Sequence, residues 1–344
     1  MIYLAEKIPW FGAHTGYEQL PQFLTPAGNG VRIVSPRSGI VPRLVGKGFS
    51  YLKRWPARNQ TATAAELEFA WQWKRRRARV AHIIYLERHL LFLTQWNRAP
   101  KHLVGTIHLP ISEWKKDQLS QLSHLQSAII LYRRDREAFE KHVGSGRTMF
   151  IHHGVDVDFF SPDRSVTHQR PRLLFGGVYL RNTSMLLRVI RRLLAKNTDL
   201  IFDLLVPVHG RANPDFVELQ KFPQVVWHAG LDDEQLRALY QQSYLALLPM
   251  NNSGANTAVV EALACGLPLI TTNVGGIRDY GGDDVFPIVE NDDDDAMVDL
   301  VERYLANTTW RDQVSNSCRH FAEKTLAWPS VARQHLDAYA VLSA

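Results

Sequence analysis

The sequence predicts an α/β protein made of two doubly wound domains, each a parallel sheet with helices on both faces. Its 344 residues, 45% hydrophobic and 22% charged, are enough for two cores at ~100–200 residues per domain. In the second half, short apolar runs alternate with helical patterns, as is typical of parallel sheets. The halves also differ in charge: residues 1–150 carry 23 Lys and Arg against 10 Asp and Glu, whereas residues 151–344 carry 17 against 24. We therefore expect two domains joined near residue 155.

In the first half, the apolar runs are short and the pattern is less regular. The expected strands are Met1–Leu4, Val31–Val34, Ala81–Tyr85, Leu103–Ile107 and Ala128–Leu131. The expected helices are Tyr17–Leu24, Ala64–Arg79, Lys116–Leu122 and Arg134–His142. Residues 36–60 are rich in Gly, Pro, Arg and Lys, and this composition predicts a long loop.

In the second half, strand and helix alternate at intervals of ~20–25 residues. The expected strands are Arg172–Phe175, Leu200–Val206, Val225–Trp227, Tyr244–Leu248 and Leu267–Thr271. The expected helices are Ser184–Leu194, Asp215–Lys221, Glu234–Gln242 and Asn256–Cys265. The acidic run Asn291–Asp295 is expected to cap the helix after it.

Composition excludes several classes of protein. Cys265 and Cys318 are the only cysteines, so a disulfide framework is excluded and a reducing compartment is expected. The first residues lack the features of a signal peptide, and no run of ~18 apolar residues predicts a spanning helix. The basic first half indicates an anionic partner: nucleic acid, an acidic membrane surface or a phosphorylated substrate.

The most informative stretch is NNSGANTAVVEALACGLPLITTNVGGIRDY, residues 251–280. A polar loop, Asn251–Asn256, leads directly into a helix, and the free amides of a helix start bind anions. Glu261 lies one turn further on, among apolar neighbours, where a carboxylate needs a partner. In a complex with a sugar nucleotide, the backbone amides would bind the diphosphate and the carboxylate would bind the ribose hydroxyls. The alternative is a surface glutamate on an amphipathic helix.

This stretch, with IHHGVDVDFFSP at residues 151–162, resembles family 4 (group 1) retaining glycosyltransferases of the GT-B fold. The ending LAWPSVARQHLDAY resembles the last helices of that family. The resemblance implies two Rossmann-like domains facing a central cleft. Residues 1–155 would form the acceptor-binding domain, to which a last helix, 329–344, returns. Residues 156–328 would bind the nucleotide-sugar donor.

The resemblance also assigns donor-binding roles. Glu261 corresponds to the second glutamate of the EX7E element of the family and would hold the ribose, whereas Ser253 stands where the first glutamate is expected. Val178 stands at the place of the family's arginine and Arg181 at that of its lysine, so Arg181 alone would pair with the diphosphate. The donor-site prediction also includes the SGAN segment and the residue after it: Ser253, Gly254, Ala255, Asn256 and Thr257.

Three further candidates lie in the first half. In VGTIHLP, His108 follows a strand and, by resemblance, orients a donor hydroxyl or assists deprotonation of the acceptor. A lone histidine is more commonly an ordinary surface or core residue. Gly12 and Gly16, in FGAHTGYEQL, would let the backbone approach the phosphate.

An acceptor or membrane face is predicted on the helix of residues 64–79. Trp71 and Trp73 lie about 200° apart around that helix, so one core cannot cover both. One of the two rings is therefore expected near the surface. The predicted face comprises Trp71, Trp73, Lys74, Arg75, Arg76 and Arg77. Contact with an anionic membrane is one interpretation. The other is that residues 43–58 cover the second ring and that the cations are merely solvated.

Together with these residues, the resemblance implies a metal-independent hexosyltransferase that uses a UDP- or GDP-linked sugar, with no cofactor. Catalysis would be electrostatic, through Arg181 and the amides at Gly254–Thr257. The expected acceptor is a glycan or lipid-linked intermediate, as in polysaccharide biosynthesis. The expected location is the cytoplasm, with the inner face of the membrane as a variant. Two alternatives remain: a basic nucleic-acid-binding protein, although no nucleic-acid-binding module is recognisable, and a catalytically inactive GT-B protein that binds nucleotide sugars.

Overall fold

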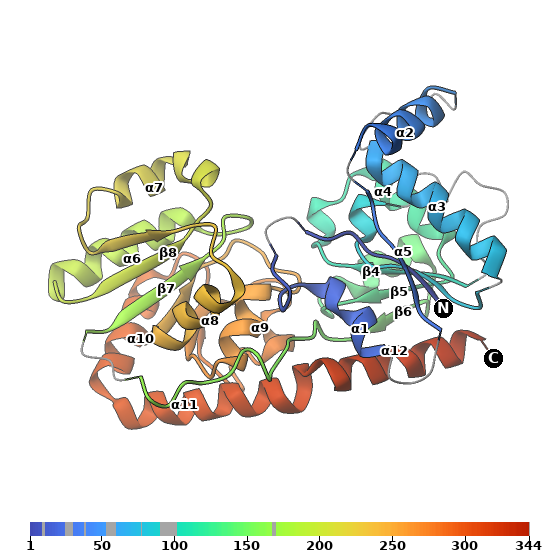
Figure 1. Ribbon diagram of the computed structural model, residues 1–344. Helices are drawn as coiled ribbons and strands as arrows, with labels where there is room; N and C mark the ends of the chain where they lie inside the picture. Colours follow the sequence, from blue (N-terminus) through green and yellow to red (C-terminus); the bar gives the residue numbers. More distant parts are fainter. Residues whose placement is uncertain are drawn as a thin grey trace. The chain divides into compact units, whose positions relative to one another are not determined.

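The computed structural model describes residues 1–8, 11–24, 30–37, 39–52, 60–76, 78–89, 102–166 and 170–343. The chain divides into two compact units. Unit 1 comprises Met1–Phe11, Gly16–His152 and Val331–Ala344, and unit 2 comprises Gly12–Thr15 and His153–Ser330. In the described part of the chain, each unit is built on one six-stranded parallel sheet flanked by helices (Figure 1). This is the pair of Rossmann-like domains that the sequence predicts.

The sheet of unit 1 has the order β2-β1-β3-β4-β5-β6. Its strands are β1 (Ile2–Leu4), β2 (Arg32–Val34), β3 (Ala81–Ile83), β4 (Leu103–Ile107), β5 (Ser127–Ile130) and β6 (Thr148–Phe150). Its α-helices are α1 (Leu20–Leu24), α2 (Ile40–Leu52), α3 (Gln60–Arg76), α4 (Lys116–Gln121), α5 (Arg136–Val143) and the part of α12 (Trp328–Ser343) that starts at Val331. The expected helix from Tyr17 begins as a 3-10 turn, Tyr17–Gln19. Strand β6 was not predicted because of its three residues only Thr148 is buried.

The predicted loop at residues 36–60 is wrong, because Ile40–Leu52 form α2. Pro42, Gly46 and Gly48 resemble a loop composition, but proline is tolerated in the first turn of a helix. Helix α2 packs along α3, and this tertiary contact outweighs the low helix propensity of two glycines. Ser38 and residues 53–59 of the expected loop lie outside the described residues, and Gln60 is the first residue of α3.

The sheet of unit 2 has the order β12-β11-β10-β7-β8-β9. Its strands are β7 (Arg172–Gly176), β8 (Ile201–Leu205), β9 (Val225–His228), β10 (Leu245–Leu248), β11 (Leu269–Thr272) and the unpredicted two-residue β12 (Ile288–Val289). Its α-helices are α6 (Thr183–Lys196), α7 (Pro214–Leu219), α8 (Asp233–Gln242), α9 (Thr257–Ala264), α10 (Asp294–Ala306) and α11 (Thr308–Phe321). The acidic run does cap α10, because Asp293 accepts a hydrogen bond from the Ala296 amide at 3.0 Å.

Helix α12 is fixed to unit 1 by buried histidines. His82 Nδ1 lies 2.6 Å from the Tyr339 hydroxyl, and His335 Nε2 lies 2.7 Å from the Tyr17 hydroxyl. His335 Nδ1 is 2.8 Å from the Val331 carbonyl. Burial lowers the pKa of His335 to about 4 and that of His82 well below 6.5. Both rings are therefore neutral at pH 7.

These lowered pKa values predict a loss of stability in mild acid. An unfolded histidine gains its proton near pH 6.5, whereas folded His335 gains it only near pH 4. Stability is therefore full above pH 6.5 and falls towards pH 4, by about 2 kcal/mol at pH 5 for one such group. We expect His335→Gln to show a smaller fall in Tm between pH 7.5 and pH 5 than the parent protein. His124→Gln, at an exposed histidine of the same unit, is the control and should leave the pH slope unchanged.

Candidate functional site

The candidate site of unit 2 is built where β7 and β10 end side by side. These strands are parallel neighbours, and the loops that follow them are joined by backbone hydrogen bonds. The Asn182 amide donates to the Pro249 carbonyl at 3.0 Å, and the Asn251 amide donates to the Leu180 carbonyl at 2.9 Å. The carboxyl ends of adjacent parallel strands are the usual place for ligands in doubly wound sheets.

Arg181 is held at this edge by three contacts. Its Nε donates to the Gly176 carbonyl at 2.7 Å, Nη2 donates to Asn256 Oδ1 at 3.3 Å, and Nη1 lies 3.2 Å from Met250 Sδ. Burial lowers the pKa of Arg181 to about 10, so the side chain stays cationic at pH 7. Val178, at the other predicted place for a cation, packs against Gly210. The Arg181 guanidinium is thus fixed beside the loop that leads into α9.

The start of α9 provides amide donors. Asn256 is its N-cap and accepts from the Ala258 amide at 3.1 Å, while also receiving the bond from Arg181. Among the described residues, none accepts a hydrogen bond from the backbone amide of Gly254 or of Ala255. Thr257 is the first helical residue. The structure thus brings Arg181 and the SGAN segment together, at a helix start that favours anions.

Ser253 anchors the backbone of this loop. It is buried, and its hydroxyl donates to the Gly254 carbonyl at 3.1 Å. Its own carbonyl accepts from the Gly276 amide at 2.9 Å. A Cβ on Gly275 would overlap the backbone of Ser253, so glycine is required there for the two loops to touch.

Glu261 is buried, which excludes the alternative of a surface glutamate. Its carboxylate accepts hydrogen bonds from Thr15 Oγ1 at 2.8 Å and from the Tyr240 hydroxyl at 2.9 Å. Burial raises the pKa of Glu261 to about 7 and that of Tyr240 well above 10. Sequence reasoning missed both partners. No local pattern links Glu261 to residues 246 and 21 positions away.

Residues 12–15 belong to unit 2, although the chain on either side of them belongs to unit 1. The Ala13 amide donates to Asp233 Oδ2 at 2.7 Å, and His14 Nδ1 lies 2.6 Å from Asp156 Oδ2. Gly12 lies against the Asp233 carboxylate, where a side chain would overlap it. Gly16 is in unit 1 beside Glu18, with a φ of 96° that favours glycine. The predicted approach of these two glycines to a phosphate stays a prediction.

His108 lies in unit 1, just after β4. Its Nε2 is 2.7 Å from the Ile84 carbonyl, and its ring lies edge-on to Tyr17 with centroids 5.0 Å apart. The carboxylate of Glu87 accepts from the His108 amide and, at 2.9 Å, from the Leu109 amide. Burial raises the pKa of Glu87 to about 7. Glu87, which the sequence did not single out, is thus a positioning residue for His108.

The basic face of α3 has one exposed tryptophan, as predicted. Trp71 is 55% exposed, and the Arg75 guanidinium lies 5.3 Å from its ring centroid. Trp73 is half-buried, and its indole N–H donates to the Ala78 carbonyl at 3.0 Å. Lys74, Arg75 and Arg76 are exposed. Arg77 lies outside the described residues.

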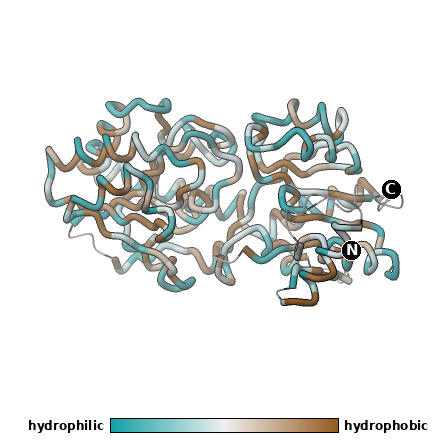
Figure 2. Tube along the Cα trace, turned by 90° about the horizontal axis from the view of Figure 1, so that it is seen from above, coloured by the Kyte–Doolittle hydropathy of each residue, from teal (hydrophilic) through white to brown (hydrophobic). Residues whose placement is uncertain are grey.

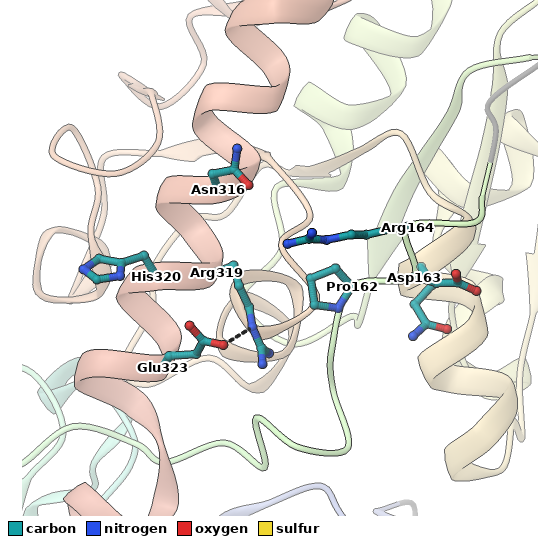
Figure 3. A pocket seen from close by; sticks show the side chains of 8 residues that line it. Pro162, Asp163, Arg164, Asn316, Arg319, His320 and Glu323 are labelled. Carbon is teal, nitrogen blue, oxygen red and sulfur yellow. Dashed lines mark hydrogen bonds and ion pairs between the residues drawn. The ribbon is translucent and has the colours of Figure 1, made fainter.

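A pocket elsewhere in unit 2 contains none of the predicted site residues (Figure 3). Arg319, which lines it, uses its Nη1 to hold the carbonyls of Val157, Phe160 and Ala264 at 2.7–2.9 Å. This arginine fixes the segment after residue 153 to the end of α9. Within the described residues, no group of three or more His, Cys, Asp or Glu side chains is arranged to hold a metal ion. None of the described helices has the length and hydropathy needed to cross a membrane.

The chain is similar in sequence to known glycosyltransferases. Residues 170–307 match the family model described as glycosyl transferases group 1. The D-inositol 3-phosphate glycosyltransferase of Nocardioides sp. is 28% identical over 221 residues, which cover 56% of this chain and 48% of that protein. The chain thus spans about half the length of the curated relatives it matches.

Solved structures match over almost the whole chain. Sucrose-phosphate synthase from Thermosynechococcus elongatus has a TM-score of 0.76 at 17% identity, with 99% of this chain and 98% of that chain covered. Anabaena HepE in complex with UDP-glucose has a TM-score of 0.75 at 12% identity, with 99% of each chain covered. The fold is therefore GT-B. In sequence, residues 170–307 resemble group 1 glycosyl transferases, and the curated relatives are glycosyltransferases.

Proposed function

We propose that unit 2 binds a nucleotide sugar and that the protein transfers the sugar to an acceptor hydroxyl with retention of anomeric configuration. The observation that carries this proposal is a chain of contacts at one sheet edge. Arg181 bonds Asn256, which caps α9, and one turn along α9 lies the buried carboxylate of Glu261. A cation, helix-start amides and a carboxylate are the groups that a ribose diphosphate needs.

In this proposal, groups of the protein neutralise the negative charge of the leaving diphosphate. Arg181 and the amides at Gly254–Thr257 stabilise the charge that develops on the diphosphate as the glycosidic bond breaks. Glu261 accepts hydrogen bonds from the ribose hydroxyls through the lone pairs that its bonds from Thr15 and Tyr240 leave open. Unit 1, with residues 16–152, receives the acceptor, a glycan or a lipid-linked intermediate.

A panel of nucleotide sugars tests the proposal. A donor at 100 times its dissociation constant stabilises the protein by ~2.7 kcal/mol, which a rise in Tm detects. UDP-linked sugars come first, because the structural neighbour HepE binds UDP-glucose, and GDP-linked sugars follow. We expect one donor to raise Tm and to release its nucleoside diphosphate when an acceptor is added. Failure of every nucleotide sugar to shift Tm would contradict the proposal.

The inactive alternative rests on Ser253, a buried hydroxyl where the related enzymes are expected to carry a carboxylate. A donor that raises Tm without any release of nucleoside diphosphate would favour it. The nucleic-acid alternative predicts retention of labelled oligonucleotides at physiological salt, and the acidic unit 2 opposes it.

His108→Ala is expected to slow turnover while nucleotide affinity stays within about twofold. The residue belongs to unit 1, whereas the groups assigned to the diphosphate and ribose belong to unit 2. General acid–base or positioning groups contribute typically 10²–10⁴-fold, so a loss of at least tenfold in kcat is expected. The control is His124→Ala, at an exposed histidine of the same unit. Full activity of His108→Ala would assign His108 to structure alone.

A further inference from the structure

Apolar side chains gather on the outer face of α2. Of the eleven large hydrophobic residues exposed in the described part of the chain, five belong to this helix: Ile40, Val41, Leu44, Val45 and Tyr51. Three of them are at least 70% exposed. Scattered apolar residues are normal on a surface, but a cluster on one helix marks an interaction site.

The five residues share one side of the helix. At 100° per residue they fall within an arc of about 140°. Gly48 lies in the same arc, with nothing within 4 Å of the place where its Cβ would be. Gly46 is buried and Pro42 half-buried on the opposite side, where α2 packs on α3. Figure 1 shows α2 outside α3, at the margin of unit 1, and Figure 2 colours the chain by hydropathy, with hydrophobic residues in brown.

Cations border this apolar face. Arg43 and Lys47 are exposed and lie at one edge of the arc, and α2 carries no acidic residue. Further exposed cations, Lys74, Arg75 and Arg76, lie on the last turn of α3, one turn after Trp71. An exposed apolar stripe flanked by Lys and Arg is the pattern of helices that lie in a membrane interface.

We propose that the outer face of α2 docks on an anionic lipid bilayer. Ile40, Val41, Leu44, Val45 and Tyr51 enter the boundary between headgroups and acyl chains, while Arg43 and Lys47 contact lipid phosphates. Charge complementarity favours this partner, because a second copy of the chain would bring the same cations into repulsion. The inference deepens the proposed function, on which it rests only for the lipid-linked acceptor.

Sedimentation with vesicles tests the docking without any nucleotide. We expect the protein to sediment with phosphatidylglycerol-containing vesicles, to stay in the supernatant with phosphatidylcholine alone, and to be released by salt. Val41→Asp should weaken binding about tenfold. Val341→Asp is the matched control, because Val341 is 75% exposed on another helix of unit 1, and it should bind like the parent. Gly48→Glu, which has room for its side chain, should reproduce the loss.

Three results would overturn the docking. One is absence of binding to anionic vesicles at low salt, and another is equal binding by Val41→Asp and Val341→Asp. The third is a dimer, seen by sedimentation velocity without vesicles, that Val41→Asp dissociates, since the apolar face would then bind a second copy. An assay of nucleoside diphosphate release with a soluble acceptor separates the two proposals. If only the docking proposal is tested, Val41→Asp should release nucleoside diphosphate like the parent protein. If the proposed function is wrong, the parent protein releases none either.

Discussion

Arg181→Ala is expected to lower kcat/KM by about 10²–10³ and to weaken binding of the nucleoside diphosphate. The guanidinium is fixed by Gly176 and Asn256 before any ligand arrives, so it needs no rearrangement as charge develops on the leaving group. Loss of one such preorganised donor costs about that factor in turnover. Single-turnover rates and calorimetric titration of the diphosphate measure the two effects.

Arg319→Ala is the matched control for Arg181→Ala. Its guanidinium also holds backbone carbonyls of unit 2, but at the other end of α9. This variant should lower Tm while leaving the diphosphate affinity unchanged. If both variants lose affinity equally, the effect of Arg181 is structural and its role at the diphosphate is wrong.

Glu261→Ala is expected to weaken the binding of the nucleoside diphosphate by tenfold or more. A hydrogen bond to a charged group is worth ~1.5–3 kcal/mol, and the ribose hydroxyls would lose their acceptor. The variant also leaves the hydroxyls of Thr15 and Tyr240 without their present partner, so its Tm should fall. Unchanged affinity, measured by calorimetry, would remove Glu261 from the site.

Glu261→Gln separates ligand binding from stability. Glutamine keeps the shape and can still bond Thr15 and Tyr240, but carries no charge. Folded Glu261 has a pKa of about 7 against 4.5 unfolded, so its ionisation opposes folding, and this cost grows from pH 4.5 upwards. By pH 8 the cost is about 3 kcal/mol.

We therefore expect Glu261→Gln to raise Tm at pH 8 and to change it little at pH 5, while nucleotide affinity falls. Glu302→Gln, which removes a half-exposed carboxylate of unit 2, should do neither. A Tm that falls at pH 8 would show that the ionised carboxylate stabilises unit 2.

Much of this fold could be predicted because its signals are local. Buried strands such as β10 are continuous apolar runs, and Asp232 marks the start of α8 through a capping box. Helix α2 was missed because its stability comes from packing against α3, not from its own residues. Strand β12 was missed because two residues carry no periodicity.

The candidate site was predictable only as far as its parts are contiguous in sequence. The loop at residues 251–256 and Glu261 lie on one strand–loop–helix unit, so the pattern locates them. The partners of Glu261 and the carboxylate of Glu87 come from other elements, which only the fold brings near. The packing of Val178 against Gly210 likewise depends on another element, the 3-10 turn Val208–Ala212 that follows β8.

The division of the chain sets an order of maturation during synthesis. All strands of unit 2 lie between residues 172 and 289, whereas unit 1 requires His335 and Tyr339 of α12 to complete its histidine contacts. Unit 2 can therefore finish folding before residues 331–343, which complete unit 1, have left the ribosome. A chain truncated after residue 330 would contain a native unit 2 and an unfinished unit 1, the reverse of the usual order in which the N-terminal domain folds first.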